Sequence, residues 1–153
     1  MNRKWVKIAA AAAGCVFAVY ALVYVDVVLR ARSAYLEGEK YRSWYEDPKL
    51  KEAAVSGWYA GEKSRLDNRL EKNKLSRDEY DRQVEILEFT KGQKLKESSI
   101  KYAYIWYQTA VELFSPPESK WVKLSREKMP KAKELWKQEL KAKNIPFEDY
   151  MLD

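Results

Sequence analysis

The N-terminal apolar run constrains this chain more than any other feature, because it is long enough to cross a lipid bilayer. The 18 residues Ile8–Val25 carry no charge, and Val27–Leu29 extend the apolar segment beyond Asp26. A helix rises about 1.5 Å per residue and a bilayer has a hydrocarbon core roughly 30 Å thick. The sequence therefore predicts a transmembrane anchor within residues 1–32.

Two kinds of cleaved leader compete with this interpretation. The apolar core of a signal peptide spans about 7–15 residues and ends at a small-residue cleavage site, whereas this run is longer and has no convincing site. The "AAGC" at residues 12–15 resembles a lipoprotein cleavage box, but the residues after Cys15 are strongly apolar and unlike a mature lipoprotein linker. An anchor that stays uncleaved is therefore favoured.

Charges and aromatic residues at both ends of the run bear on its orientation. Trp5 and Tyr24 lie near the two expected interfaces, where amphipathic rings prefer to be. Basic residues cluster before the run and also follow it (Arg3, Lys4 and Lys7 before; Arg30, Arg32, Lys40 and Arg42 after). The dense N-terminal cluster favours a cytoplasmic N-terminus. We therefore expect a single-pass protein of a bacterial inner membrane with its C-terminal domain in the periplasm.

Small and acidic residues within the run suggest two further roles. A stripe of small side chains would let a neighbouring transmembrane helix approach closely, or it is merely weakly hydrophobic filler. The stripe consists of Ala10, Gly14, Ala18 and Ala21. Asp26 is either an intramembrane proton carrier or, as we favour, the partner of Arg30 four residues on.

The remainder of the chain has the start and stop signals of helices. The first helix is expected to continue through residue 46, and Asp47–Pro48 is an N-cap followed by proline at the first helical position. Ser76 with Glu79 forms a capping box, so residues 66–87 are expected to form an antiparallel helical hairpin. Ser115 is expected to cap a further helix, and Pro130 to begin the last one.

These signals predict an all-α fold, with one N-terminal transmembrane helix followed by a small helical extramembrane domain. Only five Gly and five Pro occur in 153 residues, which favours long regular elements. We expect three parts: a tail and anchor over 1–32, a helical domain with the hairpin and an aromatic helix over 33–115, and a basic amphipathic arm with an acidic tail over 116–153.

The segment 101–114, KYAYIWYQTAVELF, is unusually aromatic. It is too short and too charged for a second span, and a strand would lack an evident partner. A helix that is apolar around most of its circumference is either covered within its own domain or docks a partner with one face. We predict a partner interface that draws on six aromatic residues: Tyr102, Tyr104, Trp106, Tyr107, Trp44 and Trp58.

The C-terminal segment 120–143 is strongly basic and amphipathic. Its basic face is predicted at Lys131, Lys133, Lys137 and Lys141. Such a face suits an acidic protein or an anionic membrane surface better than nucleic acid, because no nucleic-acid-binding motif accompanies it; it is also what an ordinary solvated helix would carry. The acidic, aromatic tail after it either folds back on the helix or reaches into a neighbouring groove.

Two residue types that carry much chemistry are scarce. The chain has no histidine and a single cysteine, Cys15, so Cys/His zinc sites, iron–sulfur clusters and an intrachain disulfide are excluded. Phosphate-binding glycine loops and nucleophile motifs are missing as well. We therefore expect no catalytic site, metal site, cofactor or small-molecule substrate.

The sequence predicts a non-catalytic, single-pass membrane subunit, or an assembly or scaffold factor, of a larger integral membrane protein complex. It would dock through aromatic helix faces and the basic C-terminal helix. The alternative is a membrane-tethered binding module whose basic helix engages anionic lipid or nucleic acid.

Overall fold

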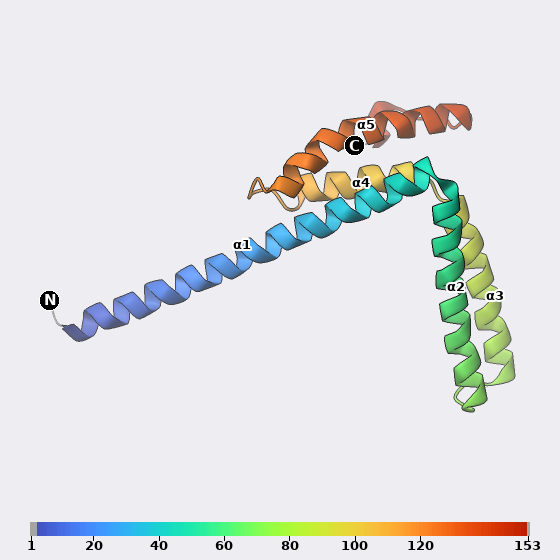
Figure 1. Ribbon diagram of the computed structural model, residues 1–153, viewed down its shortest axis with the longest axis horizontal. Helices are drawn as coiled ribbons and strands as arrows, with labels where there is room; N and C mark the ends of the chain where they lie inside the picture. The colour runs from blue at the N-terminus through green and yellow to red at the C-terminus, as the bar shows by residue number, and fades with distance from the viewer. Residues whose placement is uncertain (1–2, 153) are drawn as a thin grey trace. The chain divides into compact units, whose positions relative to one another are not determined.

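The computed structural model describes residues 3–152, without the side chains of residues 3–6, 8 and 9, and it is all-helical in that range (Figure 1). The predicted roles of the Arg3, Lys4 and Trp5 side chains and of Asp153 therefore lie outside the described residues. Five α-helices and one 3₁₀ helix follow one another: α1 (Arg3–Glu46), α2 (Pro48–Glu71), α3 (Arg77–Lys96), α4 (Ser99–Glu112), α5 (Lys120–Ala142) and η1 (Asp149–Leu152). The all-α prediction is confirmed.

The helices form two compact units. Unit 1 contains the chain up to Lys40 and from Ile100 onward, and unit 2 is Tyr41–Ser99. These units are defined by packing alone. The three-part division into residues 1–32, 33–115 and 116–153 stays a prediction.

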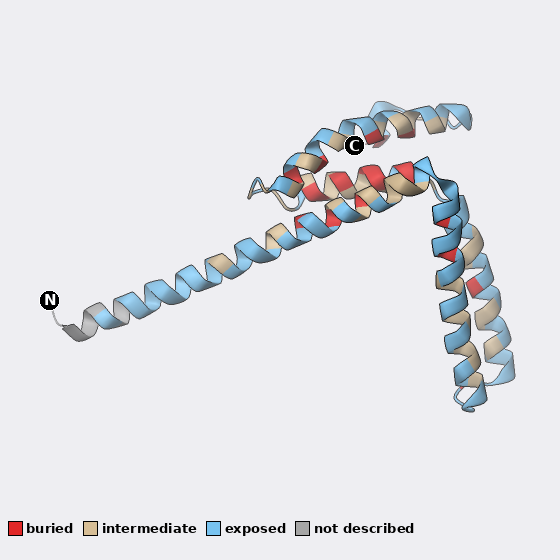
Figure 2. Cartoon of the chain, in the orientation of Figure 1, coloured by how far each residue is buried: buried red, intermediate tan, exposed pale blue. Residues whose placement is uncertain are grey.

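In unit 1, α4 packs against the second half of α1 and against α5. Buried residues of α4 recur every three or four positions, at Ile100, Ala103, Tyr104, Tyr107 and Ala110, which is the period of one helix face (Figure 2). On α1 the facing residues are small: Ala31, Ala34 and Gly38 are buried. Small residues on one helix make room for the large aromatic rings of the other.

One expectation for α5 was wrong. Pro130 does not begin a helix but lies inside α5, which starts after Ser119, whose side chain accepts a hydrogen bond from the amide of Val122. Proline normally interrupts a helix because it lacks the amide hydrogen and crowds the carbonyl four residues back. Here Pro130 and Arg126 are both exposed, so water can solvate the freed carbonyl.

Packing on both sides of this proline holds α5 together. Val122 and Ser125 before it, and Ala132 and Trp136 after it, are all buried in unit 1. Ser115, the expected cap, donates a hydrogen bond to Glu118 within the preceding loop instead.

The C-terminal tail folds back on α5. Asp149 forms an ion pair of 2.8 Å with Lys137, and Leu152 is buried. The sequence left open whether the tail folds back on this helix or reaches into a neighbouring groove. Within this chain it folds back.

Unit 2 is a helical hairpin of α2 and α3, as expected. Asp47 caps α2, and the capping box of Ser76 and Glu79 begins α3. Asn73 adopts φ 51° after the end of α2, where its neighbours complete a Schellman motif. At the other end Lys51, which is buried, donates hydrogen bonds to the carbonyls of Leu95 and Glu97 and so caps the C-terminus of α3.

Candidate functional site

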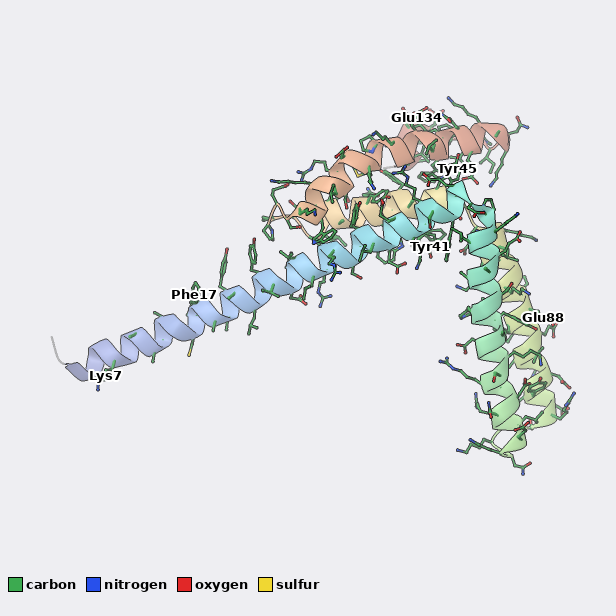
Figure 3. All side chains as sticks on the ribbon, viewed as in Figure 1. Lys7, Phe17, Tyr41, Tyr45, Glu88 and Glu134 are labelled. Atoms are coloured by element: carbon green, nitrogen blue, oxygen red, sulfur yellow. The ribbon has the colours of Figure 1, made fainter. Side chains whose placement is uncertain are left out.

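The apolar part of α1 is the most exposed apolar surface of unit 1. Phe17, Tyr20 and Leu22 are each at least 70% exposed. Figure 3 shows the side chain of Phe17 projecting from α1. Among the described residues, α1 is the one helix long and apolar enough to cross a membrane. A signal sequence near the N-terminus would meet the same criterion.

The small-residue stripe lies on this exposed surface. Ala10, Gly14 and Ala18 are exposed and Ala21 is half-buried. A Cβ placed on Gly14 would meet no described atom within 4 Å, so the stripe has room for a second helix. Its packing role stays a prediction. Asp26 pairs with Arg30 at 2.7 Å, as its spacing predicted.

The aromatic helix α4 contributes both core and surface side chains. Tyr104 and Tyr107 are buried, with ring centroids 5.7 Å from that of Trp136 and 6.1 Å from that of Tyr35, respectively. Tyr102 and Trp106 are half-buried. Tyr104 and Tyr107 therefore serve as packing residues in this conformation.

A polar cluster joins the three helices of unit 1. The Tyr107 hydroxyl donates a hydrogen bond to the carboxylate of Glu39, and Lys128 Nζ lies 2.5 Å from the other oxygen of that carboxylate and 3.0 Å from the Tyr35 hydroxyl. Burial lowers the pKa of Lys128, but the hydrogen bonds to Glu39 and Tyr35 outweigh it and raise this pKa overall. Lys128 therefore stays charged, and the cluster is a structural clamp.

Sequence reasoning missed this clamp because its members are far apart in the chain. Glu39 lies 68 residues from Tyr107 and 89 from Lys128. The available sequence signal was Gly38, beside Glu39. A glycine inside a predicted helix can mark a place where another helix packs closely, and here Gly38 faces the ring of Tyr107.

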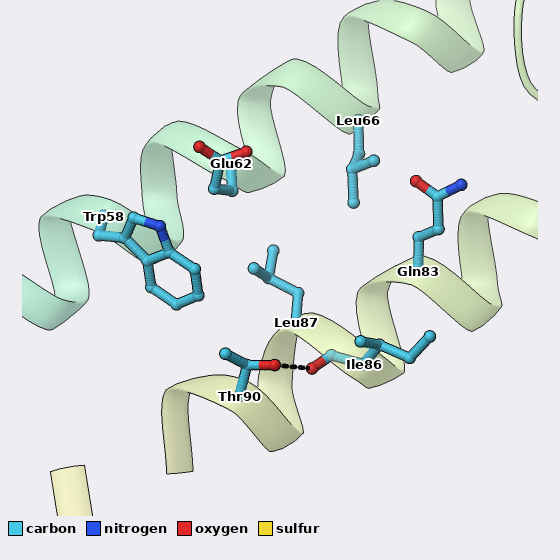
Figure 4. Close-up of a pocket in the computed structure, with 7 residues that line it drawn as sticks. All are labelled: Trp58, Glu62, Leu66, Gln83, Ile86, Leu87 and Thr90. Carbon is cyan, nitrogen blue, oxygen red and sulfur yellow. Dashed lines mark hydrogen bonds between the residues drawn. The ribbon is translucent and has the colours of Figure 1, made fainter. Parts of the chain in front are cut away.

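In unit 2 a groove runs between α2 and α3. Figure 4 shows Trp58 and Leu66 of α2 beside Leu87 of α3, with Glu62 and Gln83 at the groove's edges. The indole of Trp58 is half-buried, and Lys94 Nζ lies 5.0 Å from its ring centroid. Trp44, also in unit 2, is half-buried and packs edge-on against Tyr41 at 5.0 Å.

Two large apolar residues of α3 are exposed, and both line a hollow on α3 with Arg82 and Glu85. Ile86 lines the groove, and it and Phe89 are 64% and 66% exposed. The sequence prediction did not single them out because Tyr80, Val84 and Leu87 already form one apolar stripe at helical spacing in this segment. The spacing of three between Ile86 and Phe89, beside that stripe, was the signal for a second apolar face.

The predicted basic face of α5 is partly engaged within unit 1. Lys137 pairs with Asp149, and Lys133 Nζ lies 5.9 Å from the ring centroid of Tyr104. Lys131 and Lys141 are exposed. Two of the four predicted lysines therefore contact other side chains of unit 1, and two are exposed to solvent.

At the N-terminus of α5, hydrogen bonds perturb the carboxylate of Glu118. Arg126 donates two hydrogen bonds to Glu118, of 2.6 and 2.7 Å, and Ser115 donates a third. These hydrogen bonds lower the pKa of Glu118 from 4.5 to about 2. The bonds from Arg126 contribute more to this shift than the bond from Ser115.

Acid is therefore expected to weaken this end of α5. A lowered pKa means that the charged carboxylate contributes stability above about pH 4.5, and that this contribution disappears as the pH falls towards 2. The unfolding midpoints of wild type and Glu118→Gln, measured in urea across this pH range, should differ at pH 6 and converge near pH 2. A difference that does not change with pH would contradict the assignment.

Among the described residues, no group of three or more His, Cys, Asp or Glu side chains could hold a metal ion. Comparisons of the chain with protein families, curated proteins and solved structures return no match. Its function is therefore argued from the surfaces above.

Proposed function

We propose that this chain is a non-catalytic, single-pass subunit or assembly factor of a larger membrane protein complex. The observation that carries the proposal is the apolar half of α1, which covers the length of a bilayer and is exposed among the described residues. An apolar surface of this size is unfavourable in water and is stable in hydrocarbon. The basic residues before the span favour an extracytoplasmic C-terminal domain, which would be periplasmic in a bacterial inner membrane.

The partner-binding surface that we propose is the α2–α3 groove that the exposed side chain of Ile86 lines. The buried apolar side chains of unit 2 are Val55, Leu75 and Leu87 in the described chain. This is a small core for a hairpin of two long helices, which normally bury a continuous apolar stripe. A partner's amphipathic helix, with apolar residues three and four apart, would cover the groove and complete a three-helix packing.

Replacing Ile86, which lines the groove, with Asp is expected to abolish complex formation and to leave the anchor in place. A charge at the centre of an apolar contact costs several kcal/mol when it is buried, which lowers affinity more than about 100-fold. Native membranes are solubilised gently, and the size of the complex that contains the protein is measured by native electrophoresis. The matched control is Ile145→Asp, which changes an exposed apolar residue of unit 1.

Each part of the proposal has its own contrary result. Extraction of the wild-type protein from membranes by alkaline carbonate would contradict the anchor. A wild-type protein that stays membrane-bound but migrates as a monomer would contradict the subunit role. Equal loss of the complex in both variants would contradict the groove as the docking surface.

A further inference from the structure

The loop between α4 and α5 lies against the apolar part of α1. Pro116 and Pro117 line a groove together with Tyr20, Val23, Tyr24 and Val27, and all of these residues belong to unit 1. The contact fixes the height of the loop along the anchor. If α1 crosses a membrane, this contact therefore determines how close unit 1 lies to that membrane.

At this height the loop reaches past the polar end of the predicted span and lies beside residues of the apolar run. Tyr20 and Val27 are seven residues apart, which corresponds to about 10 Å along the helix. Asp26 is the first charged residue after the apolar run, and the loop extends past it to the level of Tyr20. If Ile8–Val25 occupies the hydrocarbon, the prolines cannot stand in bulk water.

The composition of the loop suits such a position. Residues 113–117, LFSPP, carry no charge, and Leu113 is 70% exposed. The two prolines have no amide hydrogen, so this segment has fewer backbone donors that would lose water in an apolar environment. An exposed leucine of this kind is costly in water and favourable in the boundary between headgroups and acyl chains.

Charged residues on either side of the loop fit the adjacent headgroup layer. Lys120 and Lys123 are exposed on the first turns of α5, and Arg30 is exposed on α1. Two carboxylates also flank the loop: Glu118 accepts two hydrogen bonds from Arg126, and the exposed Glu112, directly before Leu113, accepts one from Gln108. The exposed side chains nearest to the loop on α5 are basic and can attract anionic lipids.

We propose that the loop 113–117 inserts into the headgroup–acyl boundary of the bilayer that α1 crosses, with Lys120 and Lys123 on anionic headgroups. Unit 1 is then seated on the membrane at two places, the span and the loop. This inference rests on the proposed anchor, but it is not a consequence of it: a span alone would allow the loop to face water or another protein.

Site-directed spin labelling tests the insertion in the full chain. The native Cys15 is replaced by Ala, and a nitroxide is attached to Leu113→Cys, Val23→Cys or Ser64→Cys in vesicles of phosphatidylcholine and phosphatidylglycerol. Val23 is the reference inside the span, and Ser64, exposed on α2, is the aqueous reference. Collision of each label with oxygen, which concentrates in lipid, is compared with collision with a water-soluble nickel complex.

The label at position 113 is expected to favour oxygen over nickel several-fold relative to position 64, as position 23 does. Access of nickel to position 113 but not to position 23 would overturn the insertion and leave the anchor standing. Access of nickel to position 23 would overturn the anchor and the insertion with it. Shielding of position 113 from both reagents would mean that a second copy or another protein covers the loop, which also overturns the proposal.

A double variant, Lys120→Ser with Lys123→Ser, tests the headgroup contact. It should increase access of nickel to the label at position 113, and so should vesicles of phosphatidylcholine alone. If neither change has an effect, the two lysines do not bind anionic headgroups. Circular dichroism of the labelled proteins shows whether the fold is kept.

Discussion

Replacement of Tyr107 by alanine is expected to destabilise unit 1 by about 3–5 kcal/mol, the largest effect of any single substitution considered. The Tyr107 side chain is fully buried, and its ring lies against Gly38 of α1 and near Tyr35. Its removal leaves a cavity at the centre of the three-helix packing and takes one hydrogen bond from Glu39. Both the cavity and the lost hydrogen bond lower the free energy of unfolding.

Hydrogen exchange followed by mass spectrometry can locate this effect, because it reports the opening of individual helices. Amides of α4 and of the second half of α1 should exchange much faster in Tyr107→Ala, and those of α2 and α3 should change little. Tyr107→Phe keeps the ring and should cost only about 1 kcal/mol.

Trp106→Ala is the matched control on the same helix, since Trp106 is half-buried where Tyr107 is fully buried. It should destabilise unit 1 less than Tyr107→Ala. A Tyr107→Ala protein with wild-type exchange in α4 would show that this tyrosine is not a core residue, and would return it to the predicted partner interface.

Features governed by neighbouring residues could be predicted from the sequence. Asp47–Pro48 starts α2, Ser76 with Glu79 starts α3, and Asp26 pairs with Arg30, because each of these interactions spans at most four residues. Local chemistry determines them before any tertiary contact forms.

The failures involve residues whose roles depend on tertiary packing. Pro130 carries a strong local signal for a helix start, but the buried residues on both sides of it keep α5 continuous. The aromatic residues of α4 could not be divided between core and surface from periodicity alone. Tyr107 is buried against Gly38 of α1 and Tyr104 against Trp136 of α5, and no rule of spacing pairs residues this far apart in the chain.

The contact between the α4–α5 loop and α1 could not be predicted from the sequence either. The loop's sequence, LFSPP, predicted the end of one helix and a cap at Ser115 for the next, and the structure does not bear out the cap. Its contact with Tyr20–Val27 of α1, which suggests a role at the membrane, is a property of the folded chain. The anchor, by contrast, could be predicted because length and composition alone define it.

Replacing Gly38 with valine is the second substitution with a large expected effect. A Cβ at this position would lie 2.5 Å from Cε1 and 2.7 Å from Cδ1 of Tyr107, much closer than carbon atoms pack. The ring cannot move aside easily, because it is fully buried and its hydroxyl is bonded to Glu39. Overpacking of this kind costs about 1–3 kcal/mol, which exceeds the few tenths that valine gains over glycine in helix propensity.

Gly57→Val separates the steric effect from the propensity effect. Gly57 is also helical, and a Cβ there would meet no described atom within 4 Å. The control variant should therefore be unchanged or slightly more stable, by a few tenths of a kcal/mol. Faster hydrogen exchange in α4 for Gly38→Val, with no loss of protection in α2 for Gly57→Val, is the expected pair of results. Wild-type exchange in Gly38→Val would mean that α1 and α4 do not approach this closely. The clamp formed by Glu39, Tyr107 and Lys128 depends on the same approach, so this result would contradict the clamp as well.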